Sequence, residues 1–136
     1  MNKYFANYEQ SLALKELGFD EPCFGFYNHK GQLILMTQED ENSIQVYKNS
    51  YVKLGKQYTA PLKSQVFKWF RDNHRLYHNI KMFGDLNKPQ YTYIVSGKTM
   101  TNSAHMWFYE KEDSYKEAED ACINKLIEIV KQKQNA

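Results

Sequence analysis

The chain has 136 residues, a formal net charge of +2 and a mean hydropathy of −0.75. Its length suits one compact domain, and 42% hydrophobic and 15% aromatic residues are too many for a disordered chain. No apolar run approaches the roughly 20 residues of a membrane span, and Met1–Gln10 lacks the apolar stretch typical of a signal peptide, so we expect a cytoplasmic protein without a membrane partner. Cys23 and Cys122 are too few for a disulfide framework and fit a reducing compartment.

The N-terminal half predicts a helix followed by strands. Residues 7–17 form the first helix, and Gly18 stands where a left-handed residue would end it. Apolar residues on both sides of the turn-rich segment 28–31 predict a hairpin of strands 23–27 and 33–36. A short third strand follows at 44–47, within a polar segment, 37–58, that we expect to be a long loop.

The C-terminal half predicts a helix, three strands and a last helix. The middle helix starts near Pro61, which suits a first helical position, and ends at 73–74. Alternating residues predict strands at 78–83, 91–95 and 104–109.

The last helix has the clearest signals and spans 114–132. Ser114 and Glu117 form a capping-box pattern at its start. One apolar stripe repeats at spacings of three and four: Ala118, Cys122, Leu126, Ile129 and Val130.

These elements predict an α+β fold, an antiparallel sheet with helices packed on one face. The order is a helix, two or three strands, a helix, three strands and a helix. We expect a single domain over 1–136, with a possible αβββα core at 61–132.

Positive charge is concentrated in residues 48–88, which hold nine basic residues against two acidic ones. Such a segment attracts anions even when the net charge is small, although a solvated surface is the simpler interpretation. The candidate binding residues in this segment are Lys63, Lys68, Arg71, Arg75 and Lys81.

His105, Trp107 and Tyr109 alternate along a predicted strand and complete the candidate site. Exposed beside cations, they could stack a base or anchor a protein. Alternatively, the first helix or a second subunit covers them, so a homodimer is also compatible with the pattern.

Catalytic and metal-binding patterns are not found in the sequence. His74 and His78 lie four apart, but the first ends a helix and the second begins a strand, so i, i+4 metal geometry does not follow. Gly97-Lys98-Thr99 lacks the earlier glycine of a phosphate loop, because Thr92 stands there. We therefore expect no enzyme, no metal and no cofactor.

Two resemblances add to this interpretation. Several segments are similar to small uncharacterised proteins of bacteriophages and gut-bacterial prophages: Glu16–Gly25, Ala60–Leu62, Phe67–Arg71, Tyr115–Cys122 and Leu126–Glu128. That resemblance implies a phage accessory protein in the host cytoplasm with a role in countering a host defence.

Residues 61–132 resemble the double-stranded-RNA-binding domain in their order of elements and at Ser114–Ala121. In that family, lysines at the start of the last helix bind phosphates. Lys116 matches one of them, whereas Tyr115 and Glu119 stand at two others. The leading hypothesis is thus a binding protein that sequesters or blocks a host protein, and the alternative is a nucleic-acid or nucleotide binder using residues 48–88.

Overall fold

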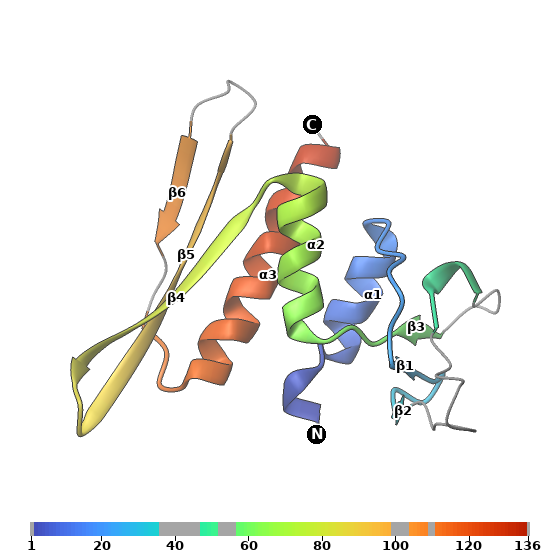
Figure 1. Ribbon diagram of the computed structural model, residues 1–136, viewed down its shortest axis with the longest axis horizontal. Helices are drawn as coiled ribbons and strands as arrows, with labels where there is room; N and C mark the ends of the chain where they lie inside the picture. Colours follow the sequence, from blue (N-terminus) through green and yellow to red (C-terminus); the bar gives the residue numbers. More distant parts are fainter. Residues whose placement is uncertain (1, 36–46, 52–56, 99–103, 109–110, 136) are drawn as a thin grey trace, which may run out of the picture. The chain divides into compact units, whose positions relative to one another are not determined.

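The computed structural model describes residues 2–35, 47–51, 57–98, 104–108 and 111–135, and for 51, 98 and 104–108 it describes the backbone alone (Figure 1). The helices and strands follow in this order: α1 (Tyr8–Glu16), β1 (Gly25–Tyr27), β2 (Leu33–Leu35), β3 (Tyr58–Thr59), α2 (Lys63–His74), β4 (Tyr77–Asp85), β5 (Lys88–Lys98), β6 (Ala104–Phe108) and α3 (Tyr115–Gln134). Short 3-10 helices lie at Asn2–Tyr4 and Asn49–Tyr51. The expected α+β class is confirmed.

The strands that the structure describes are all antiparallel but belong to two three-stranded sheets, not to one. The first has the order β2-β1-β3 and the second β4-β5-β6. The chain divides accordingly into two compact units, Met1–Gln65 and Val66–Ala136.

Local signals fix both ends of α1. Asn7 and Gln10 form a capping box, in which each side chain accepts a hydrogen bond from the other's backbone N–H, at 2.8 and 3.0 Å. Gly18 has the predicted left-handed conformation, with φ of +98°. It closes a Schellman motif, because Phe19 N–H donates to the Leu14 carbonyl and Gly18 N–H to that of Lys15.

The described third strand of the first sheet, β3 at Tyr58–Thr59, pairs with β1 from within the predicted loop 37–58. Of the predicted strand 44–47, residues 44–46 lie outside the described residues, and Tyr47 forms an isolated antiparallel bridge to Cys23. Buried Asn49 holds β3 in place, since its amide accepts from Thr59 N–H at 3.0 Å and donates to the Phe19 carbonyl at 2.7 Å.

The middle helix begins two residues after the predicted start at Pro61. Pro61 is buried, and its carbonyl accepts a bond from Ala6 N–H at 2.9 Å. Helix α2 then begins at Lys63, with the Gln65 side chain accepting from Leu62 N–H at 2.9 Å. Its end at His74 agrees with the prediction.

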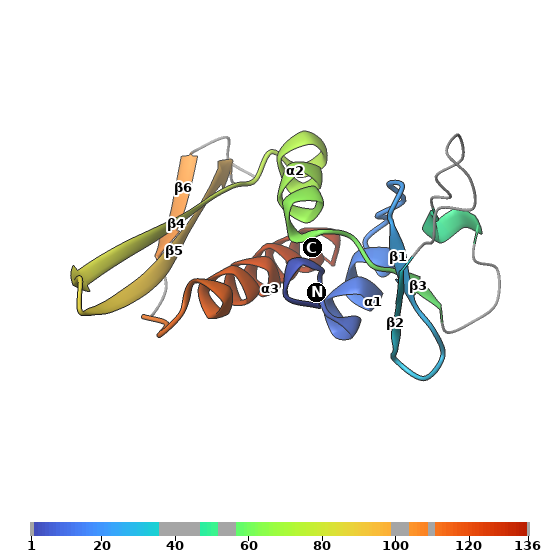
Figure 2. The ribbon, with the colours of Figure 1, turned by 60° about the horizontal axis from the view of Figure 1, so that its bottom comes forward.

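In the second unit, α2 and α3 lie on the same side of the sheet β4-β5-β6 (Figures 1 and 2). The Phe67 ring of α2 stacks on His78 of β4, with centroids 3.6 Å apart. His78 pairs with buried Val95 of β5, so these two residues mark the face that the helices cover. Because side chains alternate along a strand, Tyr77, Asn79 and Lys81 belong to the opposite face.

Helix α3 follows its sequence signals closely. The Ser114 side chain caps it by accepting from Glu117 N–H at 3.1 Å. The Glu117 carboxylate reaches back to Asp113 N–H at 3.3 Å, one residue earlier than in a capping box. Every residue of the predicted apolar stripe, from Ala118 to Val130, is buried.

Candidate functional site

Three of the predicted basic residues lie at the surface of α2. Lys68 and Arg71 are one helical turn apart, and Arg75 follows the end of the helix. Lys68 and Arg75 are exposed and Arg71 is half-buried. The neighbouring residues that enter the core lie on the other side of the helix: Val66, Phe67, Trp69 and Phe70. We call Lys68, Arg71 and Arg75 the α2 basic cluster.

The charge of the cluster is only partly offset. Lys68 forms an ion pair with Asp72, one turn further along α2. Both partners are exposed, so the pair contributes little to stability and breaks readily. The net charge of the cluster together with Asp72 is therefore positive.

Two histidines next to the cluster are held neutral. Burial, and secondarily Arg71, lowers the pKa of His78 below its usual value. Burial, and secondarily Lys133 of α3, does the same to the pKa of His74. At neutral pH these imidazoles therefore add hydrogen-bonding groups but little charge.

Arg75 has a left-handed backbone, with φ of +53°. Its N–H donates to the Arg71 carbonyl at 3.2 Å, and Leu76 N–H donates to that of Phe70 at 3.1 Å, so the turn closes the end of α2. Glycine or asparagine is the usual residue at such a position. A charged side chain is thus kept here at the cost of backbone strain.

Lys63 and Lys81 do not belong to this surface. Lys63 is only 4% exposed, because it shares with Val66, Phe67 and Phe70 the spacing of the buried stripe of α2. Lys81 is exposed, but on the sheet face away from the helices. The helical spacing of Lys63 and the alternation of side chains along the strand that holds Lys81 could have revealed both placements.

The predicted aromatic set is only partly described. The backbones of His105 and Trp107 pair with Gly97 and Val95 in the β5-β6 ladder. Their side chains, and Tyr109 altogether, lie outside the described residues. A role for these three residues stays a prediction.

The cysteines have no nucleophilic character at neutral pH. Burial raises the pKa of Cys23 to about 11 and that of Cys122 to about 12. Both are free and buried, and the thiolate, not the thiol, is the reactive form. Within the described ranges, no group of three His, Cys, Asp or Glu side chains is placed to hold a metal ion.

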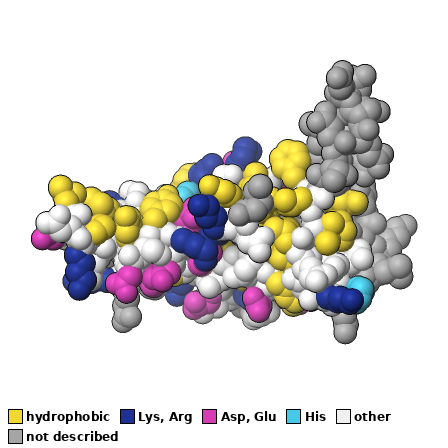
Figure 3. Space-filling model, turned by 90° about the horizontal axis from the view of Figure 1, so that it is seen from below, with side chains coloured by type: hydrophobic (Ala, Val, Ile, Leu, Met, Phe, Trp, Pro, Cys, Tyr) yellow, Lys and Arg dark blue, Asp and Glu magenta, His cyan; other side chains and the backbone are white. Residues whose placement is uncertain are grey.

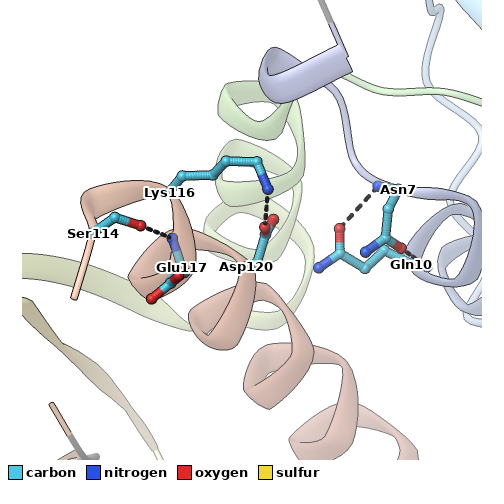
Figure 4. A network of polar contacts seen from close by, with 6 residues as sticks. All are labelled: Asn7, Gln10, Ser114, Lys116, Glu117 and Asp120. Atoms are coloured by element: carbon cyan, nitrogen blue, oxygen red, sulfur yellow. Dashed lines mark hydrogen bonds and ion pairs between the residues drawn. The ribbon is translucent and has the colours of Figure 1, made fainter. Parts of the chain in front are cut away.

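The start of α3 is acidic where the family resemblance would place phosphate-binding lysines. Lys116 forms an ion pair with Asp120 at 3.0 Å, and Glu117 lies beside the Ser114 cap (Figure 4). Exposed Asp113 precedes the helix. Any phosphate approaching this end of α3 would meet more negative than positive charge.

Sequence reasoning missed the distal part of the β4-β5 hairpin. The predicted strands ended at 83 and resumed at 91, whereas the ladder continues to the pair Asp85–Lys88. An available signal was Asp85, whose carboxylate accepts from Asn87 N–H at 3.0 Å in an Asx turn. The extension places exposed Leu86 at its turn.

No protein-family model, curated protein or solved structure matches this chain. Among the described helices, none has the length and apolar content needed to cross a bilayer.

Proposed function

We propose that the chain is a small non-enzymatic binding protein whose α2 basic cluster attaches to an acidic surface of a host protein and so blocks or sequesters it. The observation that carries this proposal is the position of Lys68, Arg71 and Arg75 on the outer side of a helix whose inner side is fixed in the core.

Rigid presentation makes the cluster suitable for binding. The buried side chains of α2 hold the helix against the second sheet, so little backbone freedom is lost on association. Arginine offers a planar fork of donors that matches a carboxylate with two hydrogen bonds. The two arginines would fix orientation, and the summed positive charge would accelerate encounter with an acidic partner.

A protein partner fits this surface better than a nucleic acid. Phosphate binding gains affinity from each neutralised phosphate, and the cluster offers three cations of which one is paired with Asp72. The Lys116 ammonium, the one lysine retained from the double-stranded-RNA-binding pattern, is offset by Asp120. An acidic protein surface can be bound by fewer cations, because each arginine can pair with one carboxylate through two hydrogen bonds.

The setting of this proposal comes from the sequence. The resemblance to bacteriophage and prophage proteins supports a role in the host cytoplasm, in defence evasion by binding. Such a role requires a stable surface that the partner can contact.

Capture from bacterial lysate with matched variants tests the proposal. The tagged protein, an Arg71→Glu/Arg75→Glu variant and a Lys3→Glu/Lys30→Glu control are compared by quantitative mass spectrometry. The control carries the same charge change on exposed lysines of the first unit. We expect a protein retained by the wild type and the control and lost by the α2 variant. Equal capture by all three would contradict the proposal.

A second candidate function is nucleic-acid or nucleotide binding through the same basic segment. It is favoured by one observation, the order helix, three antiparallel strands, helix over residues 63–134. Titration at low salt with duplex RNA, single strands and cyclic nucleotides tests it. Binding that falls steeply with salt and disappears in Lys68→Glu/Arg71→Glu would favour this candidate over the first.

A further inference from the structure

The β4-β5 hairpin extends past the start of α3, so its distal end is not covered by a helix (Figures 1 and 2). Met82 is 50% exposed and Leu86, at the turn, is 81% exposed. Tyr115, the first residue of α3, is 51% exposed. Figure 3 shows hydrophobic side chains gathered at the left end of the molecule, over this hairpin.

Tyr91 connects Met82 to Tyr115. Met82 pairs with Tyr91 across the ladder, so their side chains are neighbours on one face. The Tyr91 ring meets that of Tyr115 edge to face, with centroids 5.9 Å apart. Two backbone hydrogen bonds between Tyr91 and Glu112, of 2.9 and 2.7 Å, tie the approach to α3 to the hairpin.

Met82 and Tyr91 lie on the helix-bearing face of the sheet, and Leu86 is at the hairpin turn, four residues beyond Met82. Met82 has the same strand parity as His78, which contacts α2 through Phe67. The hairpin thus continues the face that forms the core, but beyond the point where helices cover it. We call Met82, Leu86, Tyr91 and Tyr115 the hairpin patch.

Acidic residues flank the hairpin patch at the start of α3. Asp113, two residues before Tyr115, and Glu117, two residues after it, are both exposed. Glu119 lies one turn along the helix and, after burial, is the second cause of the raised pKa of Tyr115. Of the nearby cations, Lys116 is paired with Asp120, and exposed Lys111 lies over the Phe83 ring of β4, 5.3 Å from its centroid. These carboxylates interact favourably with the positive end of the α3 dipole, and they also give the rim of the patch a negative charge.

We propose that the hairpin patch docks a basic amphipathic segment of a partner protein, with its apolar side on Met82, Leu86 and Tyr115 and its lysines or arginines beside Asp113 and Glu117. The charge of the rim selects this partner over an anionic one. The hairpin patch would bind a positively charged segment, whereas the α2 basic cluster would bind a negatively charged one. The two surfaces would therefore hold different parts of a partner.

The arrangement has the features of an interaction centre. Tyrosine and methionine are enriched at the centres of protein interfaces, where a polar rim excludes water. Tyr91 and Tyr115 support each other through their ring contact, so they lose little side-chain freedom on binding. The backbone pairing of Glu112 keeps hairpin and helix start in register before the partner arrives.

The test uses a synthetic amphipathic peptide of leucine and lysine as the probe and its leucine–glutamate analogue as the charge control. Binding is followed by the methyl NMR signals of methionine-labelled protein, in which Met82 reports directly. We expect the lysine peptide to shift the Met82 signal and to bind at least about tenfold more tightly than the glutamate peptide.

Two variants assign the contact. Leu86→Ser should weaken the lysine peptide at least about fivefold, and Asp113→Asn/Glu117→Gln should weaken it and reduce its salt dependence. Ile34→Ser, which removes an exposed apolar side chain of β2, should bind as the wild type does. Arg71→Glu/Arg75→Glu should also bind normally, so failure of the proposed function and of this inference are distinguishable. Dispersed NMR spectra establish that each variant is folded.

Other outcomes would overturn the inference. Equal affinity for both peptides would show that charge does not select the partner. Unchanged binding by Leu86→Ser would place the contact elsewhere. A concentration-dependent dimer that Leu86→Ser abolishes would make a second copy of the chain the occupant, and binding of anionic lipid vesicles lost in the same variant would make it a membrane surface.

Discussion

Replacing Arg75 with glycine should make the protein more stable while weakening its proposed binding surface. Among the described residues, Arg75 is the only non-glycine with a positive φ, at +53°. The left-handed conformation costs a residue with a Cβ about 1–2 kcal/mol. Glycine removes that cost but loses about 0.5–1 kcal/mol through the greater freedom of its unfolded chain. The expected net gain is about 0.5–1 kcal/mol in the free energy of unfolding.

The assay is urea denaturation followed by tryptophan fluorescence, with Arg75→Ala as the matched control. Alanine removes the same side chain but keeps the Cβ, so its free energy of unfolding should equal that of the wild type within about 0.5 kcal/mol. For a chain of 136 residues the glycine variant should melt a few degrees higher, at about 3–5 °C per kcal/mol. A glycine variant no more stable than the alanine variant would refute the strain argument.

Three further predictions concern packing, pH and a buried polar group. Gly97→Ala should destabilise by about 1–3 kcal/mol in denaturant titrations, because its Cβ would come within 2.6 Å of Leu76 Cδ2, and a wild-type midpoint would contradict this packing. His74 and His78 have lowered pKa values when folded, so below their usual 6.5 the unfolded chain binds more protons; stability should fall as pH decreases from 7 towards 5.5, and a flat profile would refute the assignment. Asn49→Ala should cost about 1–3 kcal/mol by thermal unfolding, since it leaves a buried amide and carbonyl unpaired, and a cost near zero would show that this clamp is dispensable.

Local signals in the sequence were sufficient to place the helix boundaries within two residues and to predict much of the second unit. Gly18 and the Ser114 cap act on backbone groups within a few residues of themselves, so their effect is readable from the sequence. The apolar spacing of α3 likewise predicted its buried stripe. The division into two sheets was not predictable in this way, because β3 is only two residues long and is recruited by Phe26 and Tyr27, far away in the chain.

The candidate site was predicted in part. Lys68, Arg71 and Arg75 lie at the surface as the charge pattern indicated, but charge alone did not reveal that Lys63 is buried. The same limit applies to Lys81, since charge does not show on which face of a sheet a strand residue lies. The net charge of a segment indicates the sign of the charge on its partner, whereas the three-dimensional arrangement decides which residues can act together.

Site-specific photo-crosslinking tests the central claim most directly. A photoreactive amino acid at position 72, between the members of the α2 basic cluster, is compared with the same group at position 30 in the β1-β2 turn, using the partner captured from lysate. The account predicts an adduct with an acidic segment of the partner from position 72 and none from position 30. Adducts from position 30 alone would contradict it.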